Sequence, residues 1–334
     1  MARALVRPLR LALLVSRPAV AWLLCLFAAI GMAQAGVRDL LTVKAALAFC
    51  AVILYVTNAA AINDLFDEAI DRINLRGARD RLLVSGDASR RQMWAVAAAS
   101  GVGAPVLGVL ISPVAGMVLG GGVLLNAAYS VPPIRLCARG IVASLLLPLF
   151  YVATPFVVGV LSTGREMSWH GALLLAGGYA ALAGRLLLKD FRDVQGDVLY
   201  GKRTFLIRHG RTATCAWSAA LWCVGAVLVA AAVPAAIVVV PLAVTLGGVV
   251  WGLQLLGRSP DARTDQQISV AVGRMGSAIG LTVLAALHFE AVAAPPLTRW
   301  AGVAMIAAYF VGGLLFTLTV TRRSLALSPG SAAA

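Results

Sequence analysis

The sequence predicts an all-α integral membrane protein, a polytopic bundle of transmembrane helices forming a single domain over residues 1–334. Of its residues, 60% are hydrophobic and 13% are charged, and the mean hydropathy is +0.90. Soluble domains carry about 25% charged residues. The apolar residues also form long runs, and the basic residues gather between every second pair of runs. These observations exclude a soluble globular fold.

Ten apolar runs are long enough to cross the hydrocarbon core, which takes roughly 20 helical residues. They cover about residues 11–34, 43–63, 92–111, 113–130, 139–162, 169–189, 213–233, 234–256, 269–292 and 299–320. Two pairs of runs almost touch, at Ser112–Pro113 and at Val233–Pro234. We predict a tight helical hairpin at each place, because so short a connection leaves the two spans side by side.

The first run, 11–34, has two interpretations. Three arginines precede it and it ends in AQA at 33–35, as a secretory signal peptide does. Arg17-Pro18 interrupts the run, however, and many spans follow it. We therefore expect an uncleaved first transmembrane helix.

The net charge of +14 follows the expected topology. The N-terminus, the loops after even-numbered spans and the C-terminus hold most of the 28 Lys and Arg residues, whereas the loops after odd-numbered spans hold only Arg38, Lys44, Arg165 and Arg299. The positive-inside rule then predicts an even number of spans and cytoplasmic termini. Basicity explained by topology does not indicate nucleic-acid binding. The preference for Arg over Lys, with many Ala and Gly, is typical of a GC-rich genome and favours a bacterial plasma membrane.

The five cysteines and three histidines do not form a site. The cysteines are scattered without a CxxC pair in or beside apolar runs, where they behave as small apolar residues. No histidine has a partner at ligand spacing. The sequence therefore indicates neither a disulfide framework nor a zinc or haem site.

Nine of the 14 acidic residues lie in two short windows. The first runs from NDLFDEAID, residues 63–71, which holds four acids, on to Asp80 and Asp87. The second, KDFRDVQGD, covers residues 189–197 and holds three. The aspartates of the first window, at positions 64, 67 and 71, recur in the second at an offset of 126 residues. Four spans separate the windows, so we expect both on the cytoplasmic side. We infer an internal parallel repeat of about four helices, with halves near 1–135 and 136–260 and further helices at 261–322.

The spacing of the aspartates has a structural consequence. Separations of three, four and seven residues place the three carboxylates of a window within about 60° of arc on a helix. Each window therefore predicts a carboxylate stripe at the cytoplasmic end of a membrane helix, where unpaired acids are costly and usually functional. The alternative is that these acids are solvated loop residues. That reading suits Glu68, Asp80 and Asp87, which fall outside the stripes, but not a spacing that occurs twice.

The donor types favour magnesium. Carboxylates with a nearby Asn and no Cys or His are hard oxygen donors, and Mg²⁺ commonly binds through a few carboxylates plus a substrate phosphate. Basic residues accompany both windows: Arg72, Arg76, Arg79 and Arg81 near the first, Lys189, Arg192, Lys202 and Arg203 near the second. Carboxylates, magnesium and basic residues around an anion indicate a polyphosphate site, although topology alone also places basic residues in these loops.

Four motifs resemble those of UbiA-type intramembrane prenyltransferases and follow that family's order. NDLFDEAID matches N-D-x-x-D-x-x-x-D, and KDFRDVQGDVLYGKRTF resembles the family's second aspartate motif. YSVPPIR at 129–135 resembles Y-S-x-P-P-x-R, and RLLVSG at 81–86 resembles R-P-L-x-S-G. Leu82 and Cys137 depart from the pattern, which has Pro and often a basic residue there. The C-terminal third matches only as hydrophobic helices.

The resemblance implies nine helices around a central cavity; with the ten runs above, we expect nine to ten transmembrane helices. It also implies a prenyl diphosphate at the cytoplasmic mouth, with two Mg²⁺ ions. One ion would be held by Asn63, Asp67 and Asp71, and the other by Asp193 and Asp197. The implied catalytic residues are Asp67, Asp71, Asp190, Asp193 and Asp197. The implied substrate-binding residues are Arg17, Asn63, Asp64, Arg72, Arg81, Tyr129, Arg135, Lys189 and Lys202.

Four of these residues have more specific expected roles. Asp190 could serve the acceptor side, Arg17 and Lys202 would contact diphosphate, and Tyr129 would face the cavity, the alternative being an ordinary helix-end tyrosine. The expected reaction is Mg²⁺-dependent transfer of a prenyl group from an isoprenyl diphosphate to an aromatic, quinone-precursor-like acceptor in the membrane. An allylic carbocation would form, and diphosphate would leave.

Two other functions remain open from the sequence. A UbiA-type membrane terpene cyclase would use the same site but quench the cation within its own chain. A cation transporter could also use paired acidic stripes on an internal repeat, but would bury them near the bilayer midplane rather than at helix ends. Prenyl length and acceptor identity are undetermined.

Overall fold

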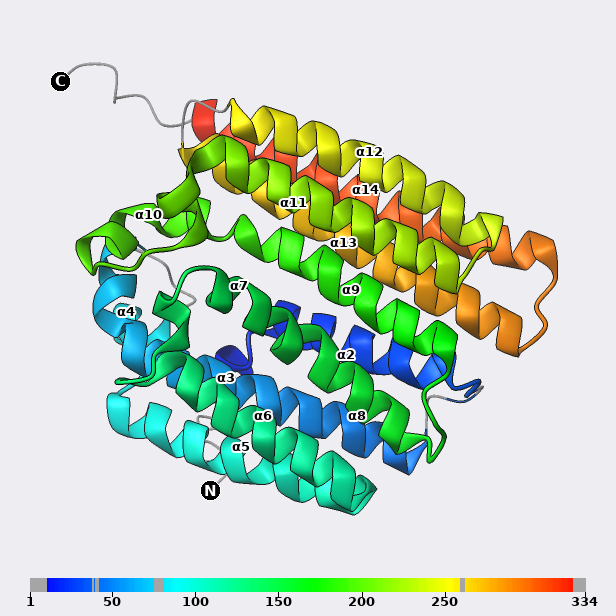
Figure 1. Cartoon of the computed structure of the whole chain (residues 1–334), viewed down its shortest axis with the longest axis horizontal. Helices are drawn as coiled ribbons and strands as arrows, with labels where there is room; N and C mark the ends of the chain where they lie inside the picture. Colours follow the sequence, from blue (N-terminus) through cyan, green and yellow to red (C-terminus); the bar gives the residue numbers. More distant parts are fainter. Residues whose placement is uncertain (1–10, 38, 40–41, 75–80, 259–261, 327–334) are drawn as a thin grey trace.

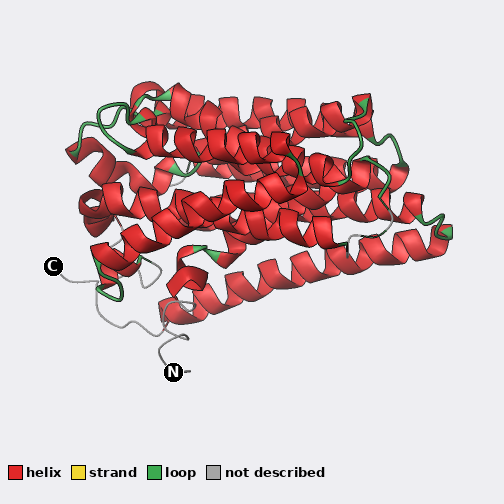
Figure 2. Cartoon of the chain, turned by 90° about the horizontal axis from the view of Figure 1, so that it is seen from below, coloured by secondary structure: helices red, strands yellow, loops and turns green. Residues whose placement is uncertain are grey.

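A computed structural model describes residues 11–37, 39, 42–74, 81–258 and 262–326, with side chains at all of these except 74, 192, 193, 195, 262–264 and 312–326. Figures 1 and 2 show a bundle of long helices, and the described residues contain no strand. The α-helices are α2 (Pro18–Gln34), α3 (Val43–Asn74), α4 (Leu82–Ser85), α5 (Arg90–Ile111), α6 (Pro113–Ser130), α7 (Ile141–Pro148), α8 (Thr154–Ser162), α9 (Trp169–Leu187), α10 (Asp190–Leu199), α11 (Phe205–Ala232), α12 (Ala236–Gly257), α13 (Ala262–Ala291) and α14 (Pro296–Ala326).

Each predicted span is helical over most of its length. In the described part of the chain, seven segments are long and apolar enough to cross a membrane: Val43–Ile73, Arg90–Ile111, Pro113–Ser130, Ile141–Ser162, Phe205–Ala232, Ala236–Gly257 and Asp265–Ala291. Two more, α2 and Pro296–Val311 of α14, are apolar but shorter. The protein is thus all-helical with many membrane-spanning segments. The count of nine to ten crossings, the internal repeat and its halves stay predictions.

The predicted hairpin between α5 and α6 is present, and a single residue makes it. The backbone N–H of Ser112 bonds to the carbonyl of Gly108 at 3.0 Å, which ends α5. Its hydroxyl accepts from the backbone N–H of Ala115 at 3.1 Å, which caps α6. Pro113 occupies the first turn of α6, where no N–H is required. The connection from α11 to α12 is similarly short.

The two aspartate windows lie on different kinds of helix. The first lies on α3, which continues eleven residues past the predicted end of its span, from position 63 to Asn74. The second was expected to continue the span 169–189, and this was wrong. α9 ends at Leu187, and the N–H groups of Leu188 and Lys189 bond three residues back, to Arg185 and Leu186, in a tightened last turn. The break gives the second window its own short helix, α10, free to take a different direction.

Two further irregularities interrupt the predicted spans. The span 139–162 divides into α7 and α8 around a π-helical turn at Leu149–Ala153. Pro155 has no N–H to continue the ladder, and the Thr154 hydroxyl instead donates to the Leu149 carbonyl at 3.0 Å. In α11, Gly210 adopts φ +76°, which kinks the helix.

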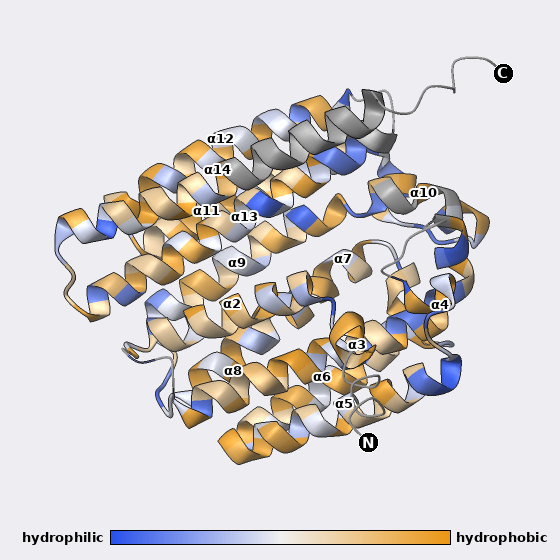
Figure 3. Ribbon diagram, turned by 180° about the vertical axis from the view of Figure 1, so that it is seen from behind, coloured by the Kyte–Doolittle hydropathy of each residue, from blue (hydrophilic) through white to orange (hydrophobic). Residues whose placement is uncertain are grey.

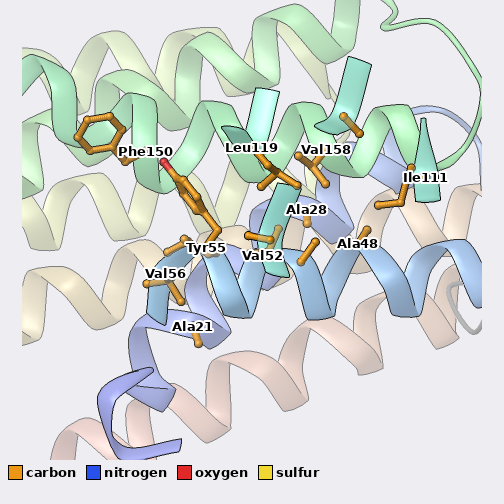
Figure 4. Packing of buried hydrophobic residues seen from close by; sticks show 14 of the residues in the cluster. Ala21, Ala28, Ala48, Val52, Tyr55, Val56, Ile111, Leu119, Phe150 and Val158 are labelled. Atoms are coloured by element: carbon orange, nitrogen blue, oxygen red, sulfur yellow. The ribbon is translucent and has the colours of Figure 1, made fainter. Parts of the chain in front are cut away.

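Glycines allow the helices to approach closely. A Cβ on Gly31 of α2 would overlap the carbonyl oxygen of Phe156, and one on Gly159 of α8 would overlap that of Ala28. The pair therefore brings the α2 and α8 backbones into direct contact. Around it lies a buried cluster drawn from α2, α3, α5, α6 and α8, in which Figure 4 shows Val52, Leu119 and Val158 side by side. Small residues at such crossings provide the packing that holds membrane helices together.

One charged interaction ties the last helices together. Arg211 of α11 forms a bidentate pair with Asp265 of α13, at 2.7 and 2.8 Å, and also donates to the Leu256 carbonyl of α12 at 2.9 Å. Its guanidinium lies over the Phe191 ring of α10, 4.9 Å from the centroid. This arginine thereby links three long helices to the second aspartate window. In Figure 1, α10 and α4 lie at the same end of the bundle.

We expect Gly159→Ala to lower the melting temperature of the detergent-purified protein by several degrees. The added methyl has no space against the α2 backbone, and overpacking of this kind costs about 1–3 kcal/mol. Gly121→Ala on α6 is the matched control, because a Cβ there meets nothing within 4 Å. Equal melting temperatures for the two variants would contradict the close α2–α8 crossing.

Candidate active site

Residues of both aspartate windows line one cavity of about 190 Å³ at the α4–α10 end of the bundle. The first window contributes Asn63, Asp67 and Asp71 from α3, and the second contributes Asp190 and Asp197 from α10. All four carboxylates belong to buried residues, between 4% and 9% exposed. Arg81 contacts both Asp64 and Asp71, so these aspartates lie on one side of α3, and Asp67 and Asp71 share the cavity with residues of the second window. The side chain of Asp193 lies outside the described part of the structure, so its predicted role stays a prediction.

The first stripe divides into ligand-facing and supporting groups. The amide of Asn63 donates to Asp67 at 2.8 Å, which fixes the orientation of that carboxylate toward the cavity. Asp64 is not among the residues that line the cavity; it is buried and pairs with both Arg17 and Arg81. Asp64 therefore positions two arginines rather than facing a ligand itself.

The backbone around Arg17 and Arg81 explains why they reach Asp64. Arg17 has φ +49° and forms the turn that breaks the first apolar run before Pro18 starts α2. Arg81 is extended and immediately precedes α4, and it also lies 3.4 Å from Asp71. Both arginines line the cavity. The interruption at Arg17-Pro18 is thus what turns an arginine inward.

Lys202 joins the two windows. Its ammonium lies 3.4 Å from Asp197 and 3.7 Å from Asp67. Its backbone N–H bonds to the carbonyl of Asp197 at 2.9 Å, which folds the turn after α10 back over the cavity. Facing carboxylates repel in a buried environment unless a cation separates them. In the protein alone, Lys202 is that cation.

The segment that links α6 to α7 contributes a further cation. Arg135 has φ +35° and donates to Asp67 at 2.7 Å. Two residues later, Cys137 occupies the position where the family often has a basic residue. Burial raises the pKa of its thiol, so Cys137 is neutral at pH 7 and adds no charge to the cavity it lines.

Arg72 does not reach the cavity, although it was predicted to bind substrate. Its side chain is 55% exposed and pairs with Glu68 at 2.8 Å on the outward face of α3. Glu68 also accepts from Arg90 of α5 at 2.6 Å. Because Arg72 is one residue past Asp71 along the helix, it points about 100° away from the stripe. Glu68 is outside the stripe as predicted, but it joins α3 to α5 instead of being merely solvated.

Three polar side chains lie deeper in the cavity. Tyr129 lines it, as predicted, and packs edge-on against Phe150 with ring centroids 5.7 Å apart. Tyr55 of α3 and Asn126 of α6 also line it, and sequence reasoning missed both. Figure 4 shows Tyr55 pointing toward Phe150. The Tyr55 ring has room because α6 carries Gly122, where a Cβ would come within 2.9 Å of it.

These deeper groups have hydrogen-bonding capacity to spare. Among the described residues, the hydroxyls of Tyr55 and Tyr129 and the amide nitrogen of Asn126 are buried without a hydrogen-bond partner. Buried polar groups are normally paired, and exceptions occur at functional sites. The one signal in the sequence was a polar Asn inside an otherwise apolar run. That Asn126 and Tyr55, from two helices, line the same cavity could not be read from spacing.

Among the described side chains, the cavity wall carries as many acidic as basic residues: Asp67, Asp71, Asp190 and Asp197 against Arg17, Arg81, Lys189 and Lys202. A diphosphate entering it would add negative charge that the wall does not offset. Among the described side chains, no three of His, Cys, Asp and Glu are grouped tightly enough to hold a metal ion by themselves. The donor set nevertheless fits Mg²⁺, which prefers oxygen ligands and takes part of its coordination from water and substrate phosphate.

The sequence matches the model of the UbiA prenyltransferase family over residues 22–275. The chain belongs to this family. The matched segment contains both aspartate windows and every residue that lines the cavity except Arg17 and Val20. It ends within α13, so α14 lies beyond it.

Curated relatives include two kinds of synthase. The chain is 34% identical over 209 residues to a digeranylgeranylglyceryl phosphate synthase of Methanoregula boonei, covering 56% of this chain and 64% of that protein. It is 31% identical over 176 residues to the chloroplastic chlorophyll synthase of Arabidopsis thaliana, covering 50% and 42%. The matched segments thus span less than two thirds of these relatives' own lengths.

Solved structures share the fold of this UbiA-family chain. One, from work on digeranylgeranylglyceryl phosphate synthase in membranes, superposes with a TM-score of 0.64 at 19% identity and covers 84% of this chain and 99% of its own. A UbiA homologue from Archaeoglobus fulgidus bound to GPP and Mg²⁺ has a TM-score of 0.59 at 18% identity, with coverage of 83% and 99%. A homologue from Aeropyrum pernix K1 has a TM-score of 0.61 at 23% identity, with coverage of 79% and 97%.

Direct metal binding tests the site without requiring turnover. With inorganic diphosphate present, we expect Mn²⁺, used as a spectroscopic substitute for Mg²⁺, to bind the purified protein in electron paramagnetic resonance titrations. Asp67→Asn and Asp197→Asn should each weaken that binding at least ~10-fold, because each removes an anionic oxygen donor. Glu68→Gln, one position along α3 and outward-facing, is the control. Unchanged Mn²⁺ affinity in both aspartate variants would reject these residues as ligands.

Proposed function

We propose that this protein is a membrane prenyltransferase that moves a prenyl group from an isoprenyl diphosphate to an acceptor, with Mg²⁺ as cofactor. One observation carries the proposal. Buried carboxylates from both aspartate windows line a single cavity and meet at Lys202, among further basic side chains. A site of this composition suits a diphosphate held through divalent cations. The structure of a UbiA homologue bound to GPP and Mg²⁺ supports the same ligand pair.

The basic side chains of the cavity have an evident role in binding. Arg17 and Arg81 are held by Asp64 with their positions set before any ligand arrives. Lys202 and Arg135 contact Asp67 from two other segments of the chain. A diphosphate between these groups would accept charge-assisted hydrogen bonds from cations already in place, which lowers the cost of ordering them. Asp67, Asp71 and Asn63 would hold one Mg²⁺ ion, and Asp197 with Asp193 the second.

In the reaction, the bond between C1 of the prenyl chain and the bridging oxygen breaks, and its electron pair leaves with diphosphate. Bound Mg²⁺ supplies positive charge that stabilises the departing diphosphate. Arg17, Arg81 and Lys202 would add donors to the same oxygens as negative charge grows there. An electron-rich carbon or oxygen of the acceptor then bonds to C1. The proton it releases passes to a nearby base, either Asp190 or a diphosphate oxygen.

The walls of the cavity below the aspartates would protect the allylic cation. Leu147, Phe150 and Tyr151 contribute apolar and aromatic surface there, and Tyr129 packs against Phe150. An apolar wall excludes water, which would otherwise capture the cation. Aromatic faces carry negative electrostatic potential and attract positive charge. The cation is thereby kept for the acceptor.

The acceptor we propose is aromatic and resembles a quinone precursor, because an electron-rich ring attacks an allylic cation readily. The names of the relatives, digeranylgeranylglyceryl phosphate synthase and chlorophyll synthase, indicate that acceptors vary widely among similar proteins. We further propose that the aspartate end of the bundle faces the cytoplasm of a bacterial cell. The charge asymmetry of the loops supports that orientation.

Asp67→Asn and Asp193→Asn should each lower turnover at least ~100-fold while leaving membrane insertion intact, because each removes a proposed metal ligand that stabilises the departing diphosphate. The assay offers purified protein geranylgeranyl diphosphate, Mg²⁺ and a panel of aromatic acceptors, and detects products by mass spectrometry. Glu68→Gln again serves as the control. Near wild-type, Mg²⁺-dependent activity in either aspartate variant would refute the assignment.

The same assay without acceptor separates transfer from cyclisation. A transferase forms an acceptor adduct and little else. A cyclised hydrocarbon that forms equally well without any acceptor would replace the proposed transfer by a terpene cyclase reaction.

Tyr55→Phe should lower kcat about 10-fold and leave the stability of the protein nearly unchanged. The variant keeps the ring that packs on Gly122 but removes the hydroxyl of a residue that lines the cavity. One hydrogen bond to a reacting group corresponds to roughly 1 kcal/mol or slightly more. Product formation measured under saturating diphosphate, beside thermal melting, tests this. Unaltered kcat would remove Tyr55 from the site.

A further inference from the structure

A second cavity of about 550 Å³ lies beside the first, between α2, α9, α11 and α13. Four residues, Val20, Tyr151, Leu186 and Lys189, line both cavities, so the two cavities adjoin there. The volume of this second cavity falls in the range of roughly 300–1,000 Å³ that is typical of small-molecule sites. Most of its lining is apolar, with Leu23, Phe27 and Phe156 among the larger side chains.

Small residues on facing helices open this cavity. Gly177, Gly178 and Ala181 line it from α9, and Gly273, Gly276 and Gly280 line it from α13. Trp222 of α11 occupies part of the resulting space and rests on both helices: a Cβ at Gly276 would come within 2.8 Å of its ring, and one at Gly184 within 3.0 Å. Glycines on α9 and α13 thus leave room both for the cavity and for the Trp222 side chain in its wall.

The charge of this cavity differs from that of the first. Arg185 of α9 and Arg274 of α13 line it together with Lys189, and none of its described lining residues is acidic. Figure 3 shows hydrophilic as well as apolar turns on the ribbons of α9 and α13. Cations inside a membrane bundle are costly and mark a ligand or ion path. A prenyl tail is uncharged, so binding such a tail would not require these basic side chains.

The position of Arg185 is set by α13. A Cβ at Gly273 would come within 2.8 Å of the Arg185 Nε and 3.3 Å of its Nη2, so the guanidinium lies directly on the glycine backbone. Both Arg185 and Arg274 also interact with other groups of the protein. A guanidinium has five N–H donors in a planar fork, so it can serve an internal partner and a planar anion together.

Two neutral polar atoms in the same wall have no partner. Within the described structure, the Ser269 hydroxyl and the Trp222 indole nitrogen are buried without a hydrogen bond, in residues 8% and 6% exposed. Both residues line the second cavity. Each can donate a hydrogen bond to an oxygen atom of a ligand. A buried donor left unpaired is destabilising, so a bound acceptor group is the simplest role for both.

We propose that the second cavity binds the acidic head of an amphipathic acceptor, a carboxylate or phosphate on an apolar body. Arg185 and Arg274 hold the anion, Ser269 and Trp222 donate to it, and the apolar walls take the rest of the molecule. The role of the bound molecule as acceptor rests on the proposed prenyl transfer. Binding of the anion does not depend on that transfer. The shared side chains at the boundary allow the reactive end of this ligand to approach the diphosphate cavity.

Binding is measured by native mass spectrometry on the full chain, without Mg²⁺ or isoprenyl diphosphate. Two matched probe pairs distinguish the sources of the anion: oleoyl lysophosphatidic acid against monoolein, and 4-octylbenzoate against 4-octylbenzyl alcohol. We expect at least one acid to bind 10-fold or more tightly than its neutral partner. Which pair shows the preference identifies the head group as phosphate or carboxylate. Equal binding within both pairs would overturn the proposal.

Variants then locate the preference. Arg185→Gln and Arg274→Gln should each reduce the ratio of acid affinity to neutral-probe affinity to threefold or less. Ser269→Ala should weaken acid binding a few-fold. Arg91→Gln, which removes an exposed arginine from α5, should change nothing. An acid preference that survives in both Arg185→Gln and Arg274→Gln would overturn the assignment, and the second variant guards against misfolding of the first.

Two more measurements separate this site from the first. Asp67→Asn should retain full acid binding even if it abolishes turnover, so failure of the proposed reaction and failure of this site are distinguishable. Inorganic diphosphate at saturating concentration should not displace the acid probe. Displacement would show that the arginines serve the diphosphate instead and would reject a separate anion site.

Discussion

The contact between Lys202 and the carboxylates of Asp67 and Asp197 is the interaction on which the rest of the site depends. The two carboxylates come from helices more than a hundred residues apart and are both buried. Without positive charge between them, their repulsion and desolvation would drive α3 and α10 apart. The same constraint explains why arginines reach the stripe from three other segments: before α2, before α4 and after α6. A buried acidic site can fold without metal only if the protein supplies its own cations.

This balance also distinguishes the two cavities. In the first, the acidic and basic side chains that the structure describes are equally numerous, which suits a ligand that arrives with its own divalent cations. In the second, the described charged residues are all basic, which suits an anion without metal. Four residues line both cavities, so the change in charge occurs between adjoining sites. Such a division would keep an acidic acceptor away from the aspartates while its reactive end approaches the prenyl donor.

The spacing of the aspartates predicted the α3 stripe correctly because a continuous helix converts separations of three and four residues into one face. The same reasoning could not separate Arg72 from Arg81. Both are arginines close to the stripe. Arg72 lies within α3 and faces outward, whereas Arg81 immediately precedes α4 and pairs with Asp64. The α9–α10 break was also missed, since the residues at 188–189 are ordinary helix formers. Tyr55 and Asn126 were missed because nothing in an apolar run tells which polar residue faces a cavity.

By itself, the sequence determined the membrane-embedded helical class, the ends of most helices and the pairing of two acidic windows. These follow from composition and from periods of three to four residues, which are local properties. Only the tertiary structure decided which side chains share a cavity, that Asp64 supports arginines, and that a second, basic cavity adjoins the first. Those outcomes depend on helix direction and on close approach at glycines such as Gly122 and Gly273, where the absence of one Cβ admits a tyrosine or a guanidinium. Contacts between distant segments have no local signature from which they could have been read.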